Sequence, residues 1–117
     1  MILRGDVVIV DFPFTDAAKS KVRPALVVQN DQDNRRIRKT VVAMIAGNLQ
    51  RRNDPCHLFI DPSDPNGASS GLHFPSLVSC NNLFTAEQAN IIQTIGHLSD
   101  SLKRTLADCL KTALELP

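Results

Sequence analysis

Tryptophan and tyrosine are both missing from this 117-residue sequence, which carries five phenylalanines as its large aromatic residues. Also missing is any apolar run of about 20 residues, the length that a membrane-spanning helix requires. The chain does not open with the basic segment, apolar stretch and small-residue cleavage site of a secreted protein. We therefore expect a cytoplasmic protein with no membrane partner, in which any ring stacking depends on phenylalanine.

Cysteine is scarce as well. Cys56, Cys80 and Cys109 form an odd, widely spaced set, which argues against a disulfide framework and against a cysteine-based zinc site. We expect reduced thiols in the core, and we expect neither a metal nor a cofactor.

The content of 43% hydrophobic and 21% charged residues is typical of a globular protein. A chain of this length supports one hydrophobic core but not two. We expect a single domain over residues 1–117.

The net charge is only +1, but the basic residues are unevenly distributed. Residues 19–52 contain two acidic residues and nine basic ones: Lys19, Lys21, Arg23, Arg35, Arg36, Arg38, Lys39, Arg51 and Arg52. Such clustering predicts a face for a polyanion; the alternative is a set of solvated loop charges.

The hydrophobic pattern predicts strands first and one helix last. Strands are expected at 7–12, 23–29, 40–46, 56–60 and 75–80, with a short sixth at 93–95 after a helical turn near Ala86, and loops at 13–22, 32–39 and 61–71. Phe12 and Phe59 are expected in the core. Ser99 is a plausible N-cap for a helix whose leucines recur at helical spacing. This order indicates an α+β fold, a small curved sheet or barrel closed by a terminal helix.

An ordered series of motifs resembles the MazF/PemK family of small bacterial toxins. The series covers nearly the whole chain and comprises Arg4–Asp6, Asp11–Asp16, Val22–Val28, Asn30–Asp31, Leu77–Cys80, Thr85 and Ile95–Asp100. The resemblance implies an SH3-like barrel of five to seven strands, a homodimer, and a cytoplasmic toxin of a type II toxin–antitoxin pair. It further implies metal-independent cleavage of single-stranded RNA, including mRNA, that leaves a 2′,3′-cyclic phosphate. The implied partner is an antitoxin that covers the RNA site and forms a DNA-binding complex with the toxin.

The sequence departs from the family pattern at several positions. The family pairs the arginine of its Arg-Pro motif with a serine or threonine at the end of the third strand, where this chain has Ala46. Asn81 replaces an acidic residue of many members, Phe84 replaces an arginine, and Ser79 stands where some members have another arginine.

Metal-free RNA cleavage needs a base for the 2′-hydroxyl, a cation for the charge that develops on phosphate, and an acid for the leaving oxygen. Arg23 suits the second role because a guanidinium binds two phosphate oxygens; the alternative is an arginine that joins loop to strand through a carboxylate. Histidine titrates near neutral pH, which makes His57 and His73 candidates, whereas His97 is expected to be structural. The alternative is that Arg23 itself transfers protons with help from Ser79 or a backbone group. The candidate catalytic residues are Arg23, His57, Ser79 and Asn81.

The candidate RNA-binding residues combine charge with stacking: Phe14, Lys19, Lys21, Arg51, Arg52 and His73. Phe74 is a further candidate for stacking. Phe84 fits either a base-stacking platform or, as the preferred interpretation, a buried or dimer-interface residue.

Two other functions remain open at this point. The changes at Ala46, Asn81 and Phe84 are compatible with a binding module of the same fold that holds RNA or an antitoxin without cutting. A gyrase-targeting toxin shares the barrel, but the Arg-Pro block argues against it.

Overall fold

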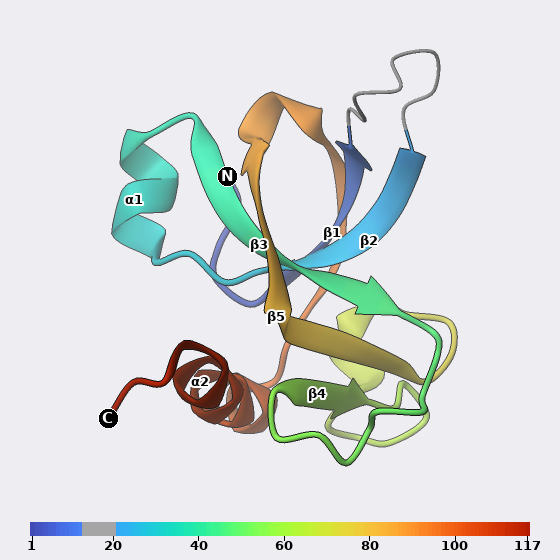
Figure 1. Cartoon of the computed structure of the whole chain (residues 1–117). Coiled ribbons are helices and arrows are strands. Elements are labelled where there is room, and N and C mark those ends of the chain that lie inside the picture. The colour runs from blue at the N-terminus through green and yellow to red at the C-terminus, as the bar shows by residue number, and fades with distance from the viewer. Residues whose placement is uncertain (13–20) are drawn as a thin grey trace.

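The structure is a computed structural model that describes residues 1–12 and 21–117. Six antiparallel strands form one sheet in the order β4-β5-β3-β2-β1-β6, and Figure 1 shows the sheet curled into a half-barrel. The elements are β1 Asp6–Phe12, β2 Lys21–Val27, α1 Asp31–Arg36, β3 Lys39–Ala46, β4 His57–Ile60, the 3-10 turn η1 Ala68–Ser70, β5 Ser76–Glu87, the 3-10 turn η2 Gln88–Asn90, β6 Ile91–His97 and α2 Asp100–Leu114. The predicted α+β class, strand number and terminal helix are confirmed.

The central strands are buried on both faces. Val8, Val10, Ala25, Val27 and Val42 belong to one core cluster. Their neighbours along the strands, Val7, Leu26 and Ala43, belong to a second core cluster. This second cluster also contains Ile45 of β3 and Leu106 of α2. Because successive residues of a strand point to opposite faces, burial on both sides explains why these strands read as continuous apolar runs rather than as alternating ones.

The terminal helix begins as predicted. The Ser99 hydroxyl accepts a hydrogen bond from the backbone N–H of Leu102 at 3.2 Å, which satisfies one of the free donors of the first turn. Leu106 and Cys109 are the buried residues of α2, and Figure 1 shows the helix beside β4 and the first half of β5. No helix in the described part of the chain is long and apolar enough to cross a membrane.

His97 is structural, as expected. Its Nδ1 lies 2.6 Å from Oδ1 of the buried Asp6, whose Oδ2 accepts the backbone N–H of Leu3. This contact ties the end of β6 to the start of β1.

The prediction of a loop over 32–39 is wrong, since α1 occupies most of it. The Asn30 side chain caps the helix by accepting the Asp33 N–H at 2.8 Å. Asn34 is buried, and its Oδ1 accepts hydrogen bonds from Gln29 and Thr40. A segment this polar has no apolar periodicity, so capping and buried polar contacts fix it in place of a hydrophobic stripe.

The expected end of the fifth strand near Cys80 and the helical turn near Ala86 are also wrong. β5 continues to Glu87, Ala86 is a buried strand residue, and the turn comes later at Gln88–Asn90. In the described sheet Ala43 pairs with Leu83 but Met44 pairs with Ser79. Three residues of β5 are thereby excluded from pairing with β3, and this bulge lets the strand bend sharply (Figure 1).

Phe59 is 37% exposed, so its assignment to the core is wrong, whereas Phe12 is buried as expected. On β4 the alternation runs in the other phase, because Leu58 and Ile60 are the inward-facing residues.

The Gly-rich segment after β4 packs closely against β6. A Cβ on Gly96 would lie 2.2 Å from the backbone carbonyl carbon of Ser70, and one on Gly71 would lie 2.0 Å from the carbonyl oxygen of Ile95. Gly71 also has φ +74°, a conformation that favours glycine. Gly47 differs, because no described heavy atom lies within 4 Å of its ideal Cβ.

We predict that Gly96→Ala lowers the free energy of unfolding by about 1–3 kcal/mol, the usual cost of overpacking. Gly47→Ala is the matched control, and it should leave stability unchanged or raise it by about 0.4–1 kcal/mol through a less flexible unfolded chain. Urea unfolding of the two variants measures both effects. Equal stability of the two variants would contradict the packing argument.

A second prediction concerns alkaline pH. Burial raises the pKa of the Cys80 thiol to about 12, above its ordinary value of 9.0. Because the folded chain holds this proton more tightly than the unfolded chain, stability is complete below about pH 9 and is lost as the pH rises toward 12. Cys80→Ala should flatten this decline in unfolding experiments between neutral pH and about pH 11. An identical decline in the variant would show that other groups cause it.

Candidate functional site

Arg23 lies in β2 at a place where the sheet opens. It pairs with Val10 of β1, whereas β2 pairs with β3 only from Ala25 onward. Pro24 therefore precedes the residues that β3 contacts, which suits a residue without a backbone N–H. The Arg23 side chain is exposed at the edge of a hollow of about 450 Å³, here called the Arg23 hollow, lined by Phe12, Lys21, Arg23, Met44, Ile45, Ala46, Asn82 and Phe84.

A second hollow adjoins the first at Ala46. This His57 hollow has a volume of about 180 Å³ and is lined by Ala46, Asn48, Gln50, Arg51, His57, Leu77 and Ser79. In the sheet, Ser79 pairs with Met44 on one side and with His57 on the other. The two hollows therefore meet at the end of β3, and together they are called the candidate groove.

The ring of His57 is held by backbone. Its Nδ1 lies 3.0 Å from the carbonyl oxygen of Arg51, and a carbonyl oxygen only accepts hydrogen bonds. Nδ1 therefore carries the hydrogen, and in the neutral form of the ring Nε2 is the nitrogen with the lone pair that can accept a proton. This is the geometry that a general base needs.

Asp54 organises the same turn. Its Oδ1 accepts the backbone N–H of Cys56 at 2.8 Å, and its backbone oxygen accepts the N–H of His57 at 3.0 Å. The Cys56 N–H lowers the pKa of Asp54, and the electrostatic attraction of His57 and Arg51 adds to the effect against some desolvation. A charged carboxylate thus lies beside His57.

The bulge of β5 decides which asparagine enters the groove. Asn81 and Asn82 are both exposed, but Asn82 lines the Arg23 hollow, whereas Asn81 is not among the described residues that line either hollow. The family motif indicates Asn81 instead. The three unpaired residues of the bulge shift the inward position by one, and a motif comparison does not reveal that shift.

Phe84 is an exposed ring beside Arg23. It is 39% exposed, and it packs edge-to-face on Phe12 with 5.0 Å between ring centroids. Within the described chain its ring is therefore held in position while part of its surface stays open, which fits the stacking alternative better than a buried role.

The remaining predicted residues fall into three groups. Lys21 and Arg51 line the groove, together with Arg23, His57 and Ser79. Arg52 and His73 are exposed but are not among the described lining residues. Phe14 and Lys19 lie outside the described residues. Asn48, Gln50 and Asn82 were missed, because isolated amides carry no motif signal.

Within the described residues, no three histidine, cysteine or acidic side chains gather as a metal site would require. The groove offers the guanidinium of Arg23, the Nε2 atom of His57, and hydroxyl and amide donors at Ser79 and Asn82. Such a set can bind a phosphate, accept a proton and stabilise developing negative charge.

Comparisons with known proteins agree with this description. The chain is 29% identical over 117 residues to endoribonuclease EndoA of Bacillus subtilis (strain 168). The match covers 99% of this chain and 97% of that protein. A mycobacterial endoribonuclease solved with its cognate antitoxin superposes with a TM-score of 0.79 at 25% identity, over 100% of this chain and 98% of that one. The Mycobacterium tuberculosis toxin MazF-mt6 superposes with a TM-score of 0.74 at 25% identity, over 96% and 98% of the two chains.

The model of one family matches residues 3–114, nearly the whole chain. It describes PemK-like, MazF-like toxins of type II toxin–antitoxin systems. The chain therefore belongs to the PemK/MazF toxin family.

Proposed function

We propose that this chain is the toxin of a type II toxin–antitoxin pair and that it cleaves single-stranded RNA, including mRNA, as an endoribonuclease. The observation that carries the proposal is the candidate groove, where Arg23 and His57 lie in adjoining hollows that share Ala46. Family membership and the relative named as an endoribonuclease support the same activity.

The reaction is an internal transesterification. Nε2 of His57 accepts the proton of the RNA 2′-hydroxyl, whose oxygen then bonds to the adjacent phosphorus. The bond from phosphorus to the 5′-oxygen breaks, and that oxygen takes a proton from a water molecule. The hydroxide left by that water takes the proton from Nε2, which restores the neutral ring. The products are a 2′,3′-cyclic phosphate and a free 5′-hydroxyl.

Arg23 stabilises the charge that develops on the phosphate oxygens during this step. Its planar guanidinium binds two oxygens at once and stays charged at all working pH values. The Asn82 amide, in the same hollow, and the Ser79 hydroxyl add neutral donors. These two residues replace the hydroxyl that the family pattern places at the position of Ala46.

The residues around the reacting phosphate bind the RNA bases and the flanking phosphates. Phe84 offers a partly exposed ring for stacking. Lys21 and Arg51 lie in the groove walls and Arg52 follows in sequence. Phe14, Lys19, His73 and Asn81 are assigned weaker roles in holding the strand.

The partners follow from the same proposal. We expect one domain over residues 1–117 that forms a homodimer in the cytoplasm and is inhibited by an antitoxin lying across the groove. The solved complex of a mycobacterial endoribonuclease with its cognate antitoxin supports the expectation of an antitoxin partner. DNA binding is expected only through the complex with the antitoxin.

We predict that Arg23→Ala reduces cleavage of a long single-stranded RNA by about 10²–10³-fold, the usual cost of losing one donor to a developing oxyanion. Arg23→Lys should keep part of the activity, because it retains the charge but loses the two-point contact. Gel analysis of RNA fragments formed in EDTA measures the loss.

The matched control is Arg104→Ala, an exposed arginine of α2, which should cleave like the unmodified protein. If the unmodified protein retards RNA on a gel but leaves it intact, the chain is a binding module and the proposal fails. The absence of a hydroxyl at Ala46 makes that outcome worth testing first.

We also predict that His57→Ala lowers the rate of cleavage by about 10²–10⁴-fold, the contribution of a general base. RNA affinity should change little, because the proposed role of the ring is proton transfer and not binding. Arg104→Ala, at an exposed position of α2 outside the candidate groove, is the control and should cleave at the unmodified rate. Cleavage by His57→Ala at the unmodified rate would assign proton transfer to another group.

A further inference from the structure

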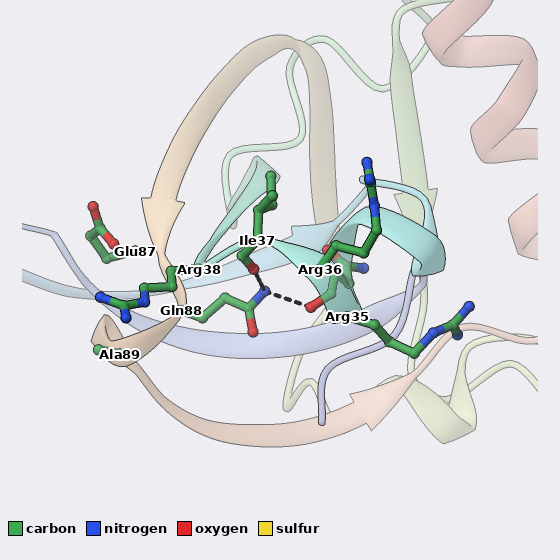
Figure 2. A pocket seen from close by; sticks show the side chains of 8 residues that line it. Arg35, Arg36, Ile37, Arg38, Glu87, Gln88 and Ala89 are labelled. Atoms are coloured by element: carbon green, nitrogen blue, oxygen red, sulfur yellow. Dashed lines mark hydrogen bonds between the residues drawn. The ribbon is translucent and has the colours of Figure 1, made fainter.

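A third hollow lies at the other end of β3, where the proposed function uses no residue. Its volume is about 450 Å³, and it is formed by the end of α1, the segment leading into β3 and the turn after β5. The residues that line this α1 hollow are Asn34, Arg35, Arg36, Ile37, Arg38, Glu87, Gln88 and Ala89 (Figure 2).

The floor of the α1 hollow is held by hydrogen bonds. Nε2 of Gln88 donates to the carbonyl oxygens of Asn34 at 2.9 Å and Ile37 at 3.0 Å, as Figure 2 shows in part. The backbone N–H of Gln88 donates to the carbonyl oxygen of Arg38 at 2.7 Å. The two walls of the hollow, far apart in sequence, are therefore fixed relative to each other before any ligand binds.

The rim carries more positive than negative charge. Three arginines face a single acidic residue, Glu87, among the lining residues. Arg36 pairs with Asp33 at 2.8 Å, and Glu87 pairs with Lys39 at 3.7 Å. In the described part of the chain, neither Arg35 nor Arg38 forms an ion pair. Two guanidinium groups therefore remain available to an anion.

The arrangement of the arginines suits a chain of phosphates better than one anion. Figure 2 shows Arg35 and Arg36 on one side of Gln88 and Arg38 on the other, with the side chains directed apart. A single phosphate requires donors that converge on one point. Donors spread along a rim match the repeated charges of a nucleic-acid backbone.

The α1 hollow is separated from the candidate groove by the length of β3. That strand runs eight residues from Lys39, which follows the lining residue Arg38, to Ala46 in the candidate groove, which corresponds to about 23 Å at 3.3 Å per residue. A stacked single strand that rises about 3.4 Å per nucleotide needs about seven nucleotides to reach both, and an extended strand with about twice that rise needs about four.

We propose that the α1 hollow is a second contact surface for the phosphodiester backbone of single-stranded RNA, outside the segment that is cleaved. This inference rests on the proposed function, because RNA must be the ligand of the candidate groove. Long RNA is held at both places, whereas RNA shorter than the separation is held only in the groove.

The test compares the binding of two RNAs to the full chain. Both carry 2′-O-methyl groups, which remove the attacking hydroxyl and prevent cleavage. One has about thirty nucleotides and the other about three, which is too short to bridge the two places even when extended. For Arg35→Gln/Arg38→Gln we expect affinity for the long RNA to fall about five- to tenfold, and the slope of log affinity against log salt to fall by about 1.4, or 0.7 per contact. Affinity for the short RNA should not change.

The charge-matched control is Arg104→Gln/Lys111→Gln, at two exposed positions of α2. An equal loss in the control, an equal loss for both RNA lengths, or no loss at all would overturn the inference. A larger loss for duplex DNA than for RNA of the same length would also overturn it, because the surface would then serve the DNA complex. Thermal unfolding of each variant shows whether its fold is intact.

Cleavage of unmodified RNA by the unaltered protein, measured in parallel, tests the proposed function separately. If cleavage is absent but the length-dependent binding is present, the endoribonuclease proposal fails and the second surface stands. If cleavage is present but the α1 variant binds normally, only the second surface fails.

Discussion

The pairing of β3 with β5 is the constraint on which the other features depend. β5 follows β3 along its whole length and also pairs with β4, so one strand joins the half-barrel to the part of the sheet beneath α2. The joint requires a bend, and the bulge between Ser79 and Leu83 supplies it. A perfectly regular strand would keep β4, and with it His57, away from the end of β2 where Arg23 lies. The irregularity in the ladder is therefore what assembles the candidate groove.

The sequence predicted the features that arise from local chemistry. Buried apolar runs placed the first four strands to within two residues at most ends, and Ser99 with its leucine stripe placed α2. It failed where tertiary contacts decide the outcome. α1 depends on the burial of Asn34 between Gln29 and Thr40, which no local pattern records. On β4, the residues that are buried are those on the face that packs toward α2. The sequence of the strand alone does not show that this face carries Leu58 and Ile60 and not Phe59.

The candidate site divides in the same way. Arg23 was identifiable from its Arg-Pro motif, and His57 and Ser79 from residue type and strand position. The choice of Asn82 over Asn81 depends on a bulge, and a bulge is a property of two paired strands. The sequence shows one basic window, whereas the fold places its described members in groups at the two ends of β3. Residue chemistry could thus be predicted from sequence, but spatial grouping required the register of the sheet.

The glycine-bearing loops after β4 and after β3 have different capacities for change. Between β4 and β5, Gly67 and Gly71 have backbone atoms where a side chain would begin, as does Gly96 within β6, so substitution of these glycines is opposed by the fold itself. The loop that opens with Gly47 after β3 has open space around it and also borders the candidate groove. Insertions and new side chains are tolerated best at such exposed sites. Relatives of this chain should therefore diverge in substrate preference through the second loop, while the first remains nearly invariant in length.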